Sequence, residues 1–251
     1  MNRKTQQMQK EITSDWYASW FDTPYYHILY KDRDNAEANS FMDRLTQFLQ
    51  LEENDTILDL ACGKGRHAIS LSQKGFQVTG VDLSPSSIAF AKQFESERLK
   101  FRVHDMCLPY PQRFNAVFNL FTSFGYFENE DDNLRTIKAI KKELKANGHG
   151  VIDFMNSEYV IKNLVPAEVK EVEGITFHIK RYVSEGYIFK EIKFQHNDIP
   201  FSYTERVKAL RLADFKEYFE KAGLKTAHCF GDYHLNEYDE ATSDRLILIF
   251  N

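Results

Sequence analysis

The stretch Ile57-Leu58-Asp59-Leu60-Ala61-Cys62-Gly63-Lys64-Gly65-Arg66-His67 decides the fold. An apolar, branched run breaks into two glycines and then continues with a helical pattern. Gly63 and Gly65 permit backbone angles and a close ligand approach that a Cβ would prevent, and the start of the following helix presents free N–H groups. We therefore expect a strand, a tight turn and a helix, with a nucleoside-bearing cofactor lying across the turn.

The glycine spacing alone leaves two cofactor classes open. Gly63 to Ala68 also fits the GxGxxG/A pattern of dinucleotide-binding enzymes, and Asp82 follows at a suitable distance. Asp59 argues against that class, because a carboxylate there would repel a pyrophosphate but would pair with an amino-acid ammonium. S-adenosylmethionine carries such an ammonium and no phosphate.

Two further acidic residues follow the next two predicted strands. Asp82 ends the second strand, where it is able to accept hydrogen bonds from both ribose hydroxyls. Asp105 follows the third strand, where it is able to accept from the adenine amine while Met106 covers the ring. Three acidic strand ends thus match the ammonium, the ribose and the base of one ligand.

These elements together resemble motifs I, II and III of the class I S-adenosylmethionine-dependent methyltransferases. The segment Ala116–Phe127 is similar to motif IV of the small-molecule branch. The resemblance implies an enzyme that moves a methyl group from S-adenosylmethionine to O or N of a small metabolite by in-line displacement. It also implies cofactor contacts from Asp59, Ala61, Cys62, Gly63, Gly65, Asp82, Leu83, Ser84, Asp105, Met106, Asn119 and Phe121.

Alternating apolar runs and helical patterns predict an α/β fold with a Rossmann-like, doubly wound, seven-stranded and mainly parallel sheet. Its first five strands are expected at Thr56–Leu60, Gln77–Val81, Leu99–Val103, Ala116–Phe121 and Gly150–Phe154. Helices are expected at about 35–49 and at His67–Gln73, Ser86–Phe94 and Glu130–Leu144, the last stopping at Asn147-Gly148. An antiparallel pair, Lys225–Phe230 and Arg245–Phe250, completes the sheet after a helix at Leu212–Ala222.

An antiparallel β insertion is expected after strand five. Its predicted strands are Val169–Val172, Ile175–Ser184, Tyr187–His196 and Phe201–Leu212. The predicted organisation is therefore a cofactor-binding core of 35–156 and 212–251, an inserted β subdomain of 157–211 and an aromatic N-terminal segment of 1–34. In similar enzymes such an insertion caps the active site or mediates dimerisation, which makes a homodimer an expected partner arrangement.

The aromatic N-terminal segment has two interpretations. It is similar to the substrate lid of small-molecule methyltransferases, and it also fits a segment that only packs onto the rest of the protein. The residues chosen to reach the substrate are Tyr25, Tyr26, Tyr30 and Arg33.

No catalytic residue is identified, because a sulfonium gives a good neutral leaving group and orientation alone supplies much of the acceleration. Asp153 and Asn156 could bind a metal, but a solvated strand end is favoured, and no metal is expected. His27, His196 and His234 could act as bases, although surface histidines usually do not.

Composition narrows the partners. A net charge of -5 and a pI near 5.9 weigh against a nucleic-acid partner, and three widely spaced cysteines suggest neither disulfides nor zinc. No signal core or apolar run long enough for a membrane span is visible, so a cytoplasmic protein with a small-molecule substrate is expected. Two alternatives stay open: an S-adenosylmethionine-binding protein without transferase activity, and an RNA or protein methyltransferase.

Overall fold

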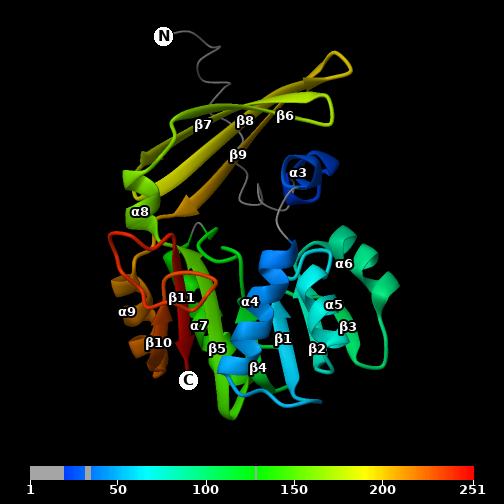
Figure 1. The fold of residues 1–251 in the computed structure, drawn as a ribbon, viewed down its shortest axis with the longest axis vertical. Coiled ribbons are helices and arrows are strands. Elements are labelled where there is room, and N and C mark those ends of the chain that lie inside the picture. The colour runs from blue at the N-terminus through cyan, green and yellow to red at the C-terminus, as the bar shows by residue number, and fades with distance from the viewer. Residues whose placement is uncertain (1–19, 32–34, 128) are drawn as a thin grey trace. The chain divides into compact units, whose positions relative to one another are not determined.

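The computed structural model describes residues 20–31, 35–127 and 129–251. They form two compact units, coloured along the chain in Figure 1. The core unit contains the described part of 33–164 together with Lys208–Asn251. The insert unit contains the described part of 1–32 together with Val165–Val207.

The core unit is built on a seven-stranded sheet with the order β10-β11-β5-β4-β1-β2-β3. Strands β1 to β5 are parallel, whereas β11 runs antiparallel to both β5 and β10. This confirms the predicted Rossmann-like sheet with an antiparallel C-terminal pair. The strands are β1 (Thr56–Leu60), β2 (Gln77–Asp82), β3 (Leu99–Val103), β4 (Phe114–Asn119), β5 (Leu144–Met155), β10 (Thr226–Phe230) and β11 (Arg245–Phe250).

Helices cover both faces of this sheet (Figure 1). On one face, Phe41, Leu71 and Ile88 join a single buried cluster with the sheet residue Phe118. On the other face, aromatic pairs join helix to sheet, with the rings of Phe219 and Phe250 4.3 Å apart. The first face carries α4 (Asn35–Phe48), α5 (Arg66–Gln73) and α6 (Pro85–Ala91), and the second carries α7 (Glu130–Glu143) and α9 (Leu212–Ala222). Short helices η1 (Lys92–Phe94) and α8 (Ser157–Lys162) complete the unit.

The insert unit is a four-stranded sheet, ordered β6-β7-β8-β9, with one short helix, α3 (Pro24–Leu29). The antiparallel pairing of β6 with β7 and of β7 with β8 confirms the predicted antiparallel insertion. The Tyr25 ring of α3 lies 4.7 Å from the rings of Phe194 and Phe201, so the helix packs on the sheet. The strands are β6 (Ala167–Val172), β7 (Ile175–Ser184), β8 (Tyr187–His196) and β9 (Ile199–Lys208).

Two predicted element ends are wrong for identifiable backbone reasons. Strand β4 ends at Asn119 and excludes Phe121, whose φ of 58° is incompatible with an extended strand. Asn147-Gly148 does not stop a helix, because α7 already ends at Glu143. Asn147, with φ 63°, lies within β5, where the pairing with β4 shifts register.

Phe101 explains why the second glycine of the decisive stretch is required. This ring is fully buried. A Cβ added to Gly65 would lie 2.4 Å from the ring, and one added to Gly80 would lie 2.6 Å from it. Two glycines, one after β1 and one in β2, therefore make the space that a single phenylalanine of β3 fills.

We expect Gly65→Ala to destabilise the protein more than Gly63→Ala. Both residues have a positive φ, so each alanine pays about 1 kcal/mol of left-handed strain. Only Gly65 meets Phe101, and this overpacking adds about 1–3 kcal/mol, whereas a Cβ at Gly63 meets no atom within 4 Å. Urea unfolding of both variants without ligand measures the difference, and equal losses would contradict the packing role of Phe101.

Candidate functional site at the strand ends of the core sheet

The site lies where the strand order of the core sheet reverses. Strand β1 pairs with β4, and the chain leaves β1 toward β2 on one side and β4 toward β5 on the other, so the two connections diverge from adjacent carboxyl ends. A crevice at such a switch point is the usual ligand position in open α/β sheets. The residues after β1, β2, β3 and β4 therefore define the candidate site.

The glycine turn after β1 is held by backbone hydrogen bonds. Cys62 N–H donates to the Val81 carbonyl at 2.9 Å, and Gly65 N–H donates to the Cys62 carbonyl at 3.0 Å. Ala61, Gly63 and Gly65 all have positive φ values. The chain thereby turns within four residues and enters α5 with its first N–H groups facing the strand ends.

Asp82 fixes the turn from the neighbouring strand. Its Oδ2 accepts the Gly63 N–H at 2.8 Å, and its Oδ1 accepts the Ser84 N–H at 2.8 Å. Ser84 in turn accepts the Ser87 N–H and caps α6. One carboxylate thus shapes two turns at the end of β2.

Asp59 is buried beside this turn and lacks a cationic partner in its surroundings. Its side chain is 3% exposed and accepts a hydrogen bond from the Ala68 N–H, whereas its Oδ2 has no hydrogen-bond partner among the described residues. Burial raises the pKa of Asp59 to about 7, and the nearby charge of Asp82 adds to the shift. An unpaired buried carboxylate is costly, which marks this oxygen as the acceptor for a donor from outside the chain.

Asn119 supplies a second unpaired acceptor at the end of β4. The residue is fully buried, and its Nδ2 donates to the Leu60 carbonyl at 3.3 Å. Its Oδ1 has no partner in the described part of the chain. The ends of the adjacent strands β1 and β4 therefore each present one unsatisfied oxygen to a ligand.

Asp105, the third acidic residue, makes a hydrogen bond within its own turn. Asp105 Oδ1 accepts the Cys107 N–H at 2.9 Å and so shapes the turn after β3. Met106 is half-buried, with its sulfur 3.7 Å from the Asn119 amide nitrogen, and Leu83 is 46% exposed. An exposed leucine and a half-buried methionine at neighbouring strand ends leave apolar surface for a flat ring.

His67 and Tyr233 are site residues that the sequence did not single out. The His67 ring stacks on Phe121 with centroids 4.3 Å apart, and Tyr233 lies 5.5 Å from the same ring. His67 directly follows the glycine turn, and this position in the sequence could have indicated a site residue. Tyr233 lies between β10 and β11, and no local pattern links that loop to β4.

The sequence favoured a solvated strand end for Asp153 and Asn156, but both residues are buried. Asp153 is fully buried, and Arg245 donates to it from Nε and Nη2 at 2.8 and 2.6 Å. Asn156 is 2% exposed and donates to the carbonyls of Glu240 and Ser243. The expectation failed because Arg245 lies 92 positions further along the chain and only the fold brings it to Asp153.

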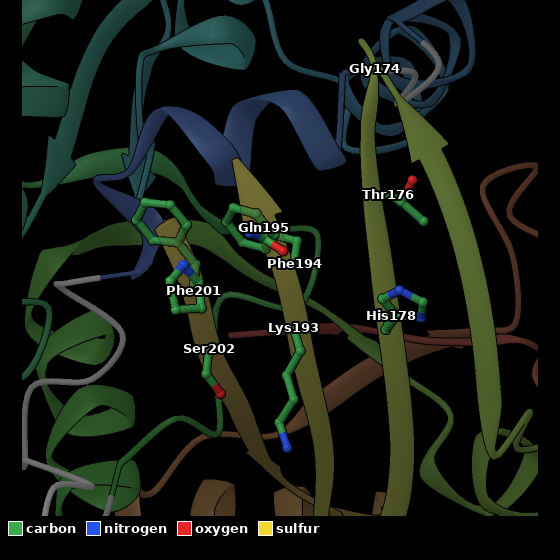
Figure 2. Close-up of a pocket in the computed structure, with 9 residues that line it drawn as sticks. Gly174, Thr176, His178, Lys193, Phe194, Gln195, Phe201 and Ser202 are labelled. Atoms are coloured by element: carbon green, nitrogen blue, oxygen red, sulfur yellow. The ribbon is translucent and has the colours of Figure 1, made fainter. Parts of the chain in front are cut away.

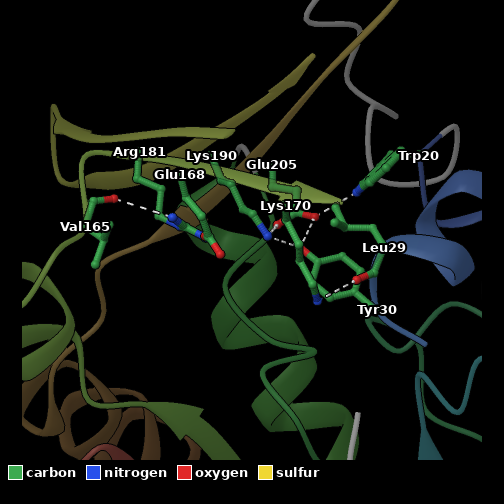
Figure 3. Close-up of polar contacts among 9 residues, drawn as sticks. All are labelled: Trp20, Leu29, Tyr30, Val165, Glu168, Lys170, Arg181, Lys190 and Glu205. Atoms are coloured by element: carbon green, nitrogen blue, oxygen red, sulfur yellow. Dashed lines mark hydrogen bonds and ion pairs between the residues drawn. The ribbon is translucent and has the colours of Figure 1, made fainter. Parts of the chain in front are cut away.

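The three predicted lid tyrosines belong to the insert unit, where they contact its own residues. Tyr30 donates to Glu205 at 2.7 Å and contacts Lys190, and Trp20 also donates to Glu205 (Figure 3). Tyr25 bonds to His196 at 3.1 Å, and Tyr26 packs edge-on against Trp20. The predicted fourth residue, Arg33, lies outside the described residues.

A second hollow occurs on the insert sheet, with His178 on β7 and Lys193 on β8 at its wall (Figure 2). These two side chains are exposed, as are the neighbouring Thr176, Gln195 and Ser202. Because these polar side chains are hydrated, none of them is a buried acceptor without a partner, unlike Asp59 and Asn119 of the core site.

Comparison with known proteins agrees with this geometry. A family model described as a methyltransferase domain matches residues 33–228. The putative methyltransferase YqeM of Bacillus subtilis (strain 168) is 33% identical over 139 residues, which cover 53% of this chain and only 56% of that protein. A glycine/sarcosine N-methyltransferase of Parasynechococcus marenigrum (strain WH8102) is 25% identical, over 92% of this chain and 82% of its own length.

A solved structure shares the fold over nearly the whole chain. It is the SAM-bound amino pentose methyltransferase CalS10 of Micromonospora echinaspora, with a TM-score of 0.70 and 17% identity. The likeness covers 91% of this chain and 96% of that one. Among the described residues, no helix combines the length and the apolar character needed to cross a membrane.

We expect Asp59→Asn to stabilise the ligand-free protein at alkaline pH. The folded-state pKa of about 7 exceeds the unfolded value near 3.9, so ionising Asp59 costs the folded protein stability as pH rises through that window. The variant should match the wild type near pH 4 and exceed it at pH 8 by up to about 4 kcal/mol. Urea unfolding at both pH values checks this, and a difference independent of pH would contradict it. Glu143, whose pKa burial also raises to about 7, titrates in both proteins and cancels.

Proposed function

Since the chain belongs to the methyltransferase domain family, we propose that it transfers a methyl group from S-adenosylmethionine to an amine nitrogen of a small metabolite. The observation that carries the donor is the buried Asp59 carboxylate, which has an unpaired oxygen and no adjacent cation. The family membership and the fold support methyl transfer, and the donor and acceptor are inferred from the site and the relatives.

The residues of the site fit S-adenosylmethionine. Its ammonium supplies both the positive charge and the N–H donors that Asp59 lacks. The N-terminal end of α5 suits its carboxylate, and the Asp82 carboxylate at the end of β2 suits its ribose hydroxyls. A dinucleotide fits less well, because its pyrophosphate at the glycine turn would meet the buried Asp59 carboxylate, which lacks a cationic partner among the described residues.

The proposed acceptor follows from the relatives. The Parasynechococcus marenigrum relative acts on glycine and sarcosine, and CalS10 acts on an amino pentose. Both names specify small molecules that carry a nitrogen. An amine acceptor is also compatible with a protein of net charge -5, which does not repel a cationic substrate.

The chemistry asks little of the side chains beyond orientation. S-adenosylmethionine supplies an activated methyl group whose departure leaves a neutral thioether. Asp59, Asp82 and the glycine turn hold the donor, so that an amine approaching in line needs no covalent help from the protein. The amine must arrive neutral, since a protonated nitrogen has no lone pair to attack with. A base is therefore optional for acceptors that lose their proton in water.

Other sequence-based hypotheses stay predictions. The homodimer rests on the use of such insertions in similar enzymes, and the cytoplasmic location rests on the sequence showing no signal core. Acidic charge continues to favour a small molecule over RNA. An S-adenosylmethionine-binding role without transfer is separated from the proposed enzyme by the acceptor experiment below.

We expect the affinity for S-adenosylmethionine to peak at about pH 7–8. Below pH 7 Asp59 must lose a proton before it pairs with the ammonium, so the Kd rises by up to about tenfold per pH unit. Above pH 8 the ammonium itself deprotonates, and the affinity falls again. Isothermal titration calorimetry from pH 5.5 to 9 measures this profile, with NAD as the competing ligand class.

Asp59→Asn tests the assignment directly. The variant should bind S-adenosylmethionine about 10- to 100-fold more weakly at pH 7.5, and it should lose the acidic limb of the profile. Asp105→Asn, at the end of β3 and two strands away from β1, is the matched control, and it should keep the wild-type acidic limb. Tight NAD binding, or an acidic limb that survives in Asp59→Asn, would refute the donor assignment.

We expect amines to be methylated in preference to their hydroxyl analogues. Pairs such as glycine with glycolate, and amino sugars with the parent sugars, isolate the acceptor atom at constant size. Formation of S-adenosylhomocysteine and of the N-methyl product should increase with pH as the acceptor amine loses its proton. Exclusive methylation of the hydroxyl member of such pairs would overturn the nitrogen assignment.

A further inference from the structure

The loop after β4 has an unfavourable backbone that something must hold. Phe121 and Thr122 follow each other with φ values of 58° and 59°. Residues with a side chain rarely adopt this left-handed region, and a β-branched threonine is disfavoured there most of all. Such strain persists only where surrounding contacts enforce it, and it concentrates at functional sites.

Asp153 on β5 makes the enforcing contacts to both backbone groups. Its Oδ2 accepts the Phe121 N–H at 2.7 Å. Its main-chain carbonyl accepts the Thr122 N–H at 3.0 Å. One residue therefore binds two consecutive strained residues, through its side chain and through its backbone.

Arg245 on β11 completes the arrangement. Its Nε and Nη2 donate to Asp153 Oδ1, and Nη2 also donates to the Thr122 hydroxyl at 3.1 Å. Tyr233 adds a hydroxyl 3.3 Å from Asp153 Oδ2. Because Asp153 is fully buried, its charge depends on this guanidinium, and the planar group in turn fixes where the threonine lies. We call these two residues the Asp153–Arg245 clamp.

The held loop connects to the glycine turn. Phe121 stacks on His67, with 13° between the rings, and His67 lies two residues after Gly65. Two residues before Phe121, Asn119 presents its unpaired Oδ1. The clamp is thus linked through one aromatic ring to the start of α5, and through three residues of chain to the open acceptor on β4.

We propose that Asp153 and Arg245 are positioning residues for methyl transfer, which hold Phe121 against His67 and so fix the loop after β4 beside the donor. The inference rests on the proposed function for its kinetic consequence. Its structural half, the control of the Phe121–His67 stack, is independent of any activity.

The test uses a small set of variants of the full chain. Arg245→Lys keeps the charge beside Asp153 but cannot reproduce the two-point contact and reach Thr122. Thr122→Gly removes the backbone strain, because glycine adopts positive φ freely. Phe121→Leu removes the stacking ring and gives the reference for a lost stack. Arg135→Lys, which alters a half-exposed ion pair with Asp132 on α7, is the matched control.

The chemical shifts of the His67 ring protons in nuclear magnetic resonance measure the Phe121–His67 stack in the ligand-free protein. The Phe121 ring shields these protons in the wild type, so Phe121→Leu should move their signals downfield. Arg245→Lys should reproduce most of that movement, and Arg245→Lys with Thr122→Gly should reverse it in part. Arg135→Lys should leave the signals unchanged.

Steady-state kinetics measures the effect of the clamp on methyl transfer. Arg245→Lys should lower kcat by about 10- to 100-fold, with a change in KM for S-adenosylmethionine of less than about threefold. Adding Thr122→Gly should recover at least half of that loss on a logarithmic scale. A residue that only stabilised the fold would lower the unfolding midpoint without this split between kcat and KM.

Two outcomes overturn the proposal: unchanged His67 signals in Arg245→Lys, or lowered His67 shielding with wild-type kcat. A wild-type protein that binds no S-adenosylmethionine and methylates no acceptor would instead refute the proposed function. In that case the resonance measurement still decides whether the clamp holds the stack.

Discussion

A carboxylate that ionises when buried at a strand end is costly unless a positive charge meets it, and the core sheet treats two such carboxylates differently. Asp153 receives Arg245 from within the chain, with contacts at 2.8 and 2.6 Å. Asp59, also buried at the end of β1, receives the Ala68 N–H and, among the described residues, no cation. The first carboxylate is therefore structural, whereas the second retains its cost until a ligand arrives. This unequal treatment of two similar groups is the basis for proposing a binding site at the end of β1.

Much of the fold could be predicted because its signals are local. The glycine turn, the alternation of strands and helices, and the regular polar-apolar pattern of the insertion each lie within a few residues of chain. The mainly parallel seven-stranded sheet and its antiparallel C-terminal pair were predicted, and both are confirmed. Asp59 and Asp82 were identified for the same reason, since each sits directly at a predicted strand end.

The remainder depends on contacts between distant segments. Nothing near Asp153 in the sequence indicates Arg245, and nothing near Phe121 indicates that the strand has already ended. A left-handed pair such as Phe121-Thr122 contradicts local preference, so only its distant partners explain it. The contacts of Tyr30 depend on distant segments as well, because Glu205 and Lys190 reach it only once β8 and β9 are formed. Local sequence patterns indicated the residues proposed to bind the donor, but not the long-range contacts around them.

The pairing of β5 with β11 also has a consequence for the order in which the protein is made. Arg245 follows Asp153 by 92 positions, and the whole insert sheet is encoded between them. During synthesis β1 to β5 leave the ribosome first, with Asp153 present and its guanidinium still untranslated. Until then the nascent core holds Asp153 without the guanidinium that neutralises it. The loop after β4 therefore gains the clamp only when β11 joins the sheet, so a chain that ends before β11 lacks both the clamp and that strand.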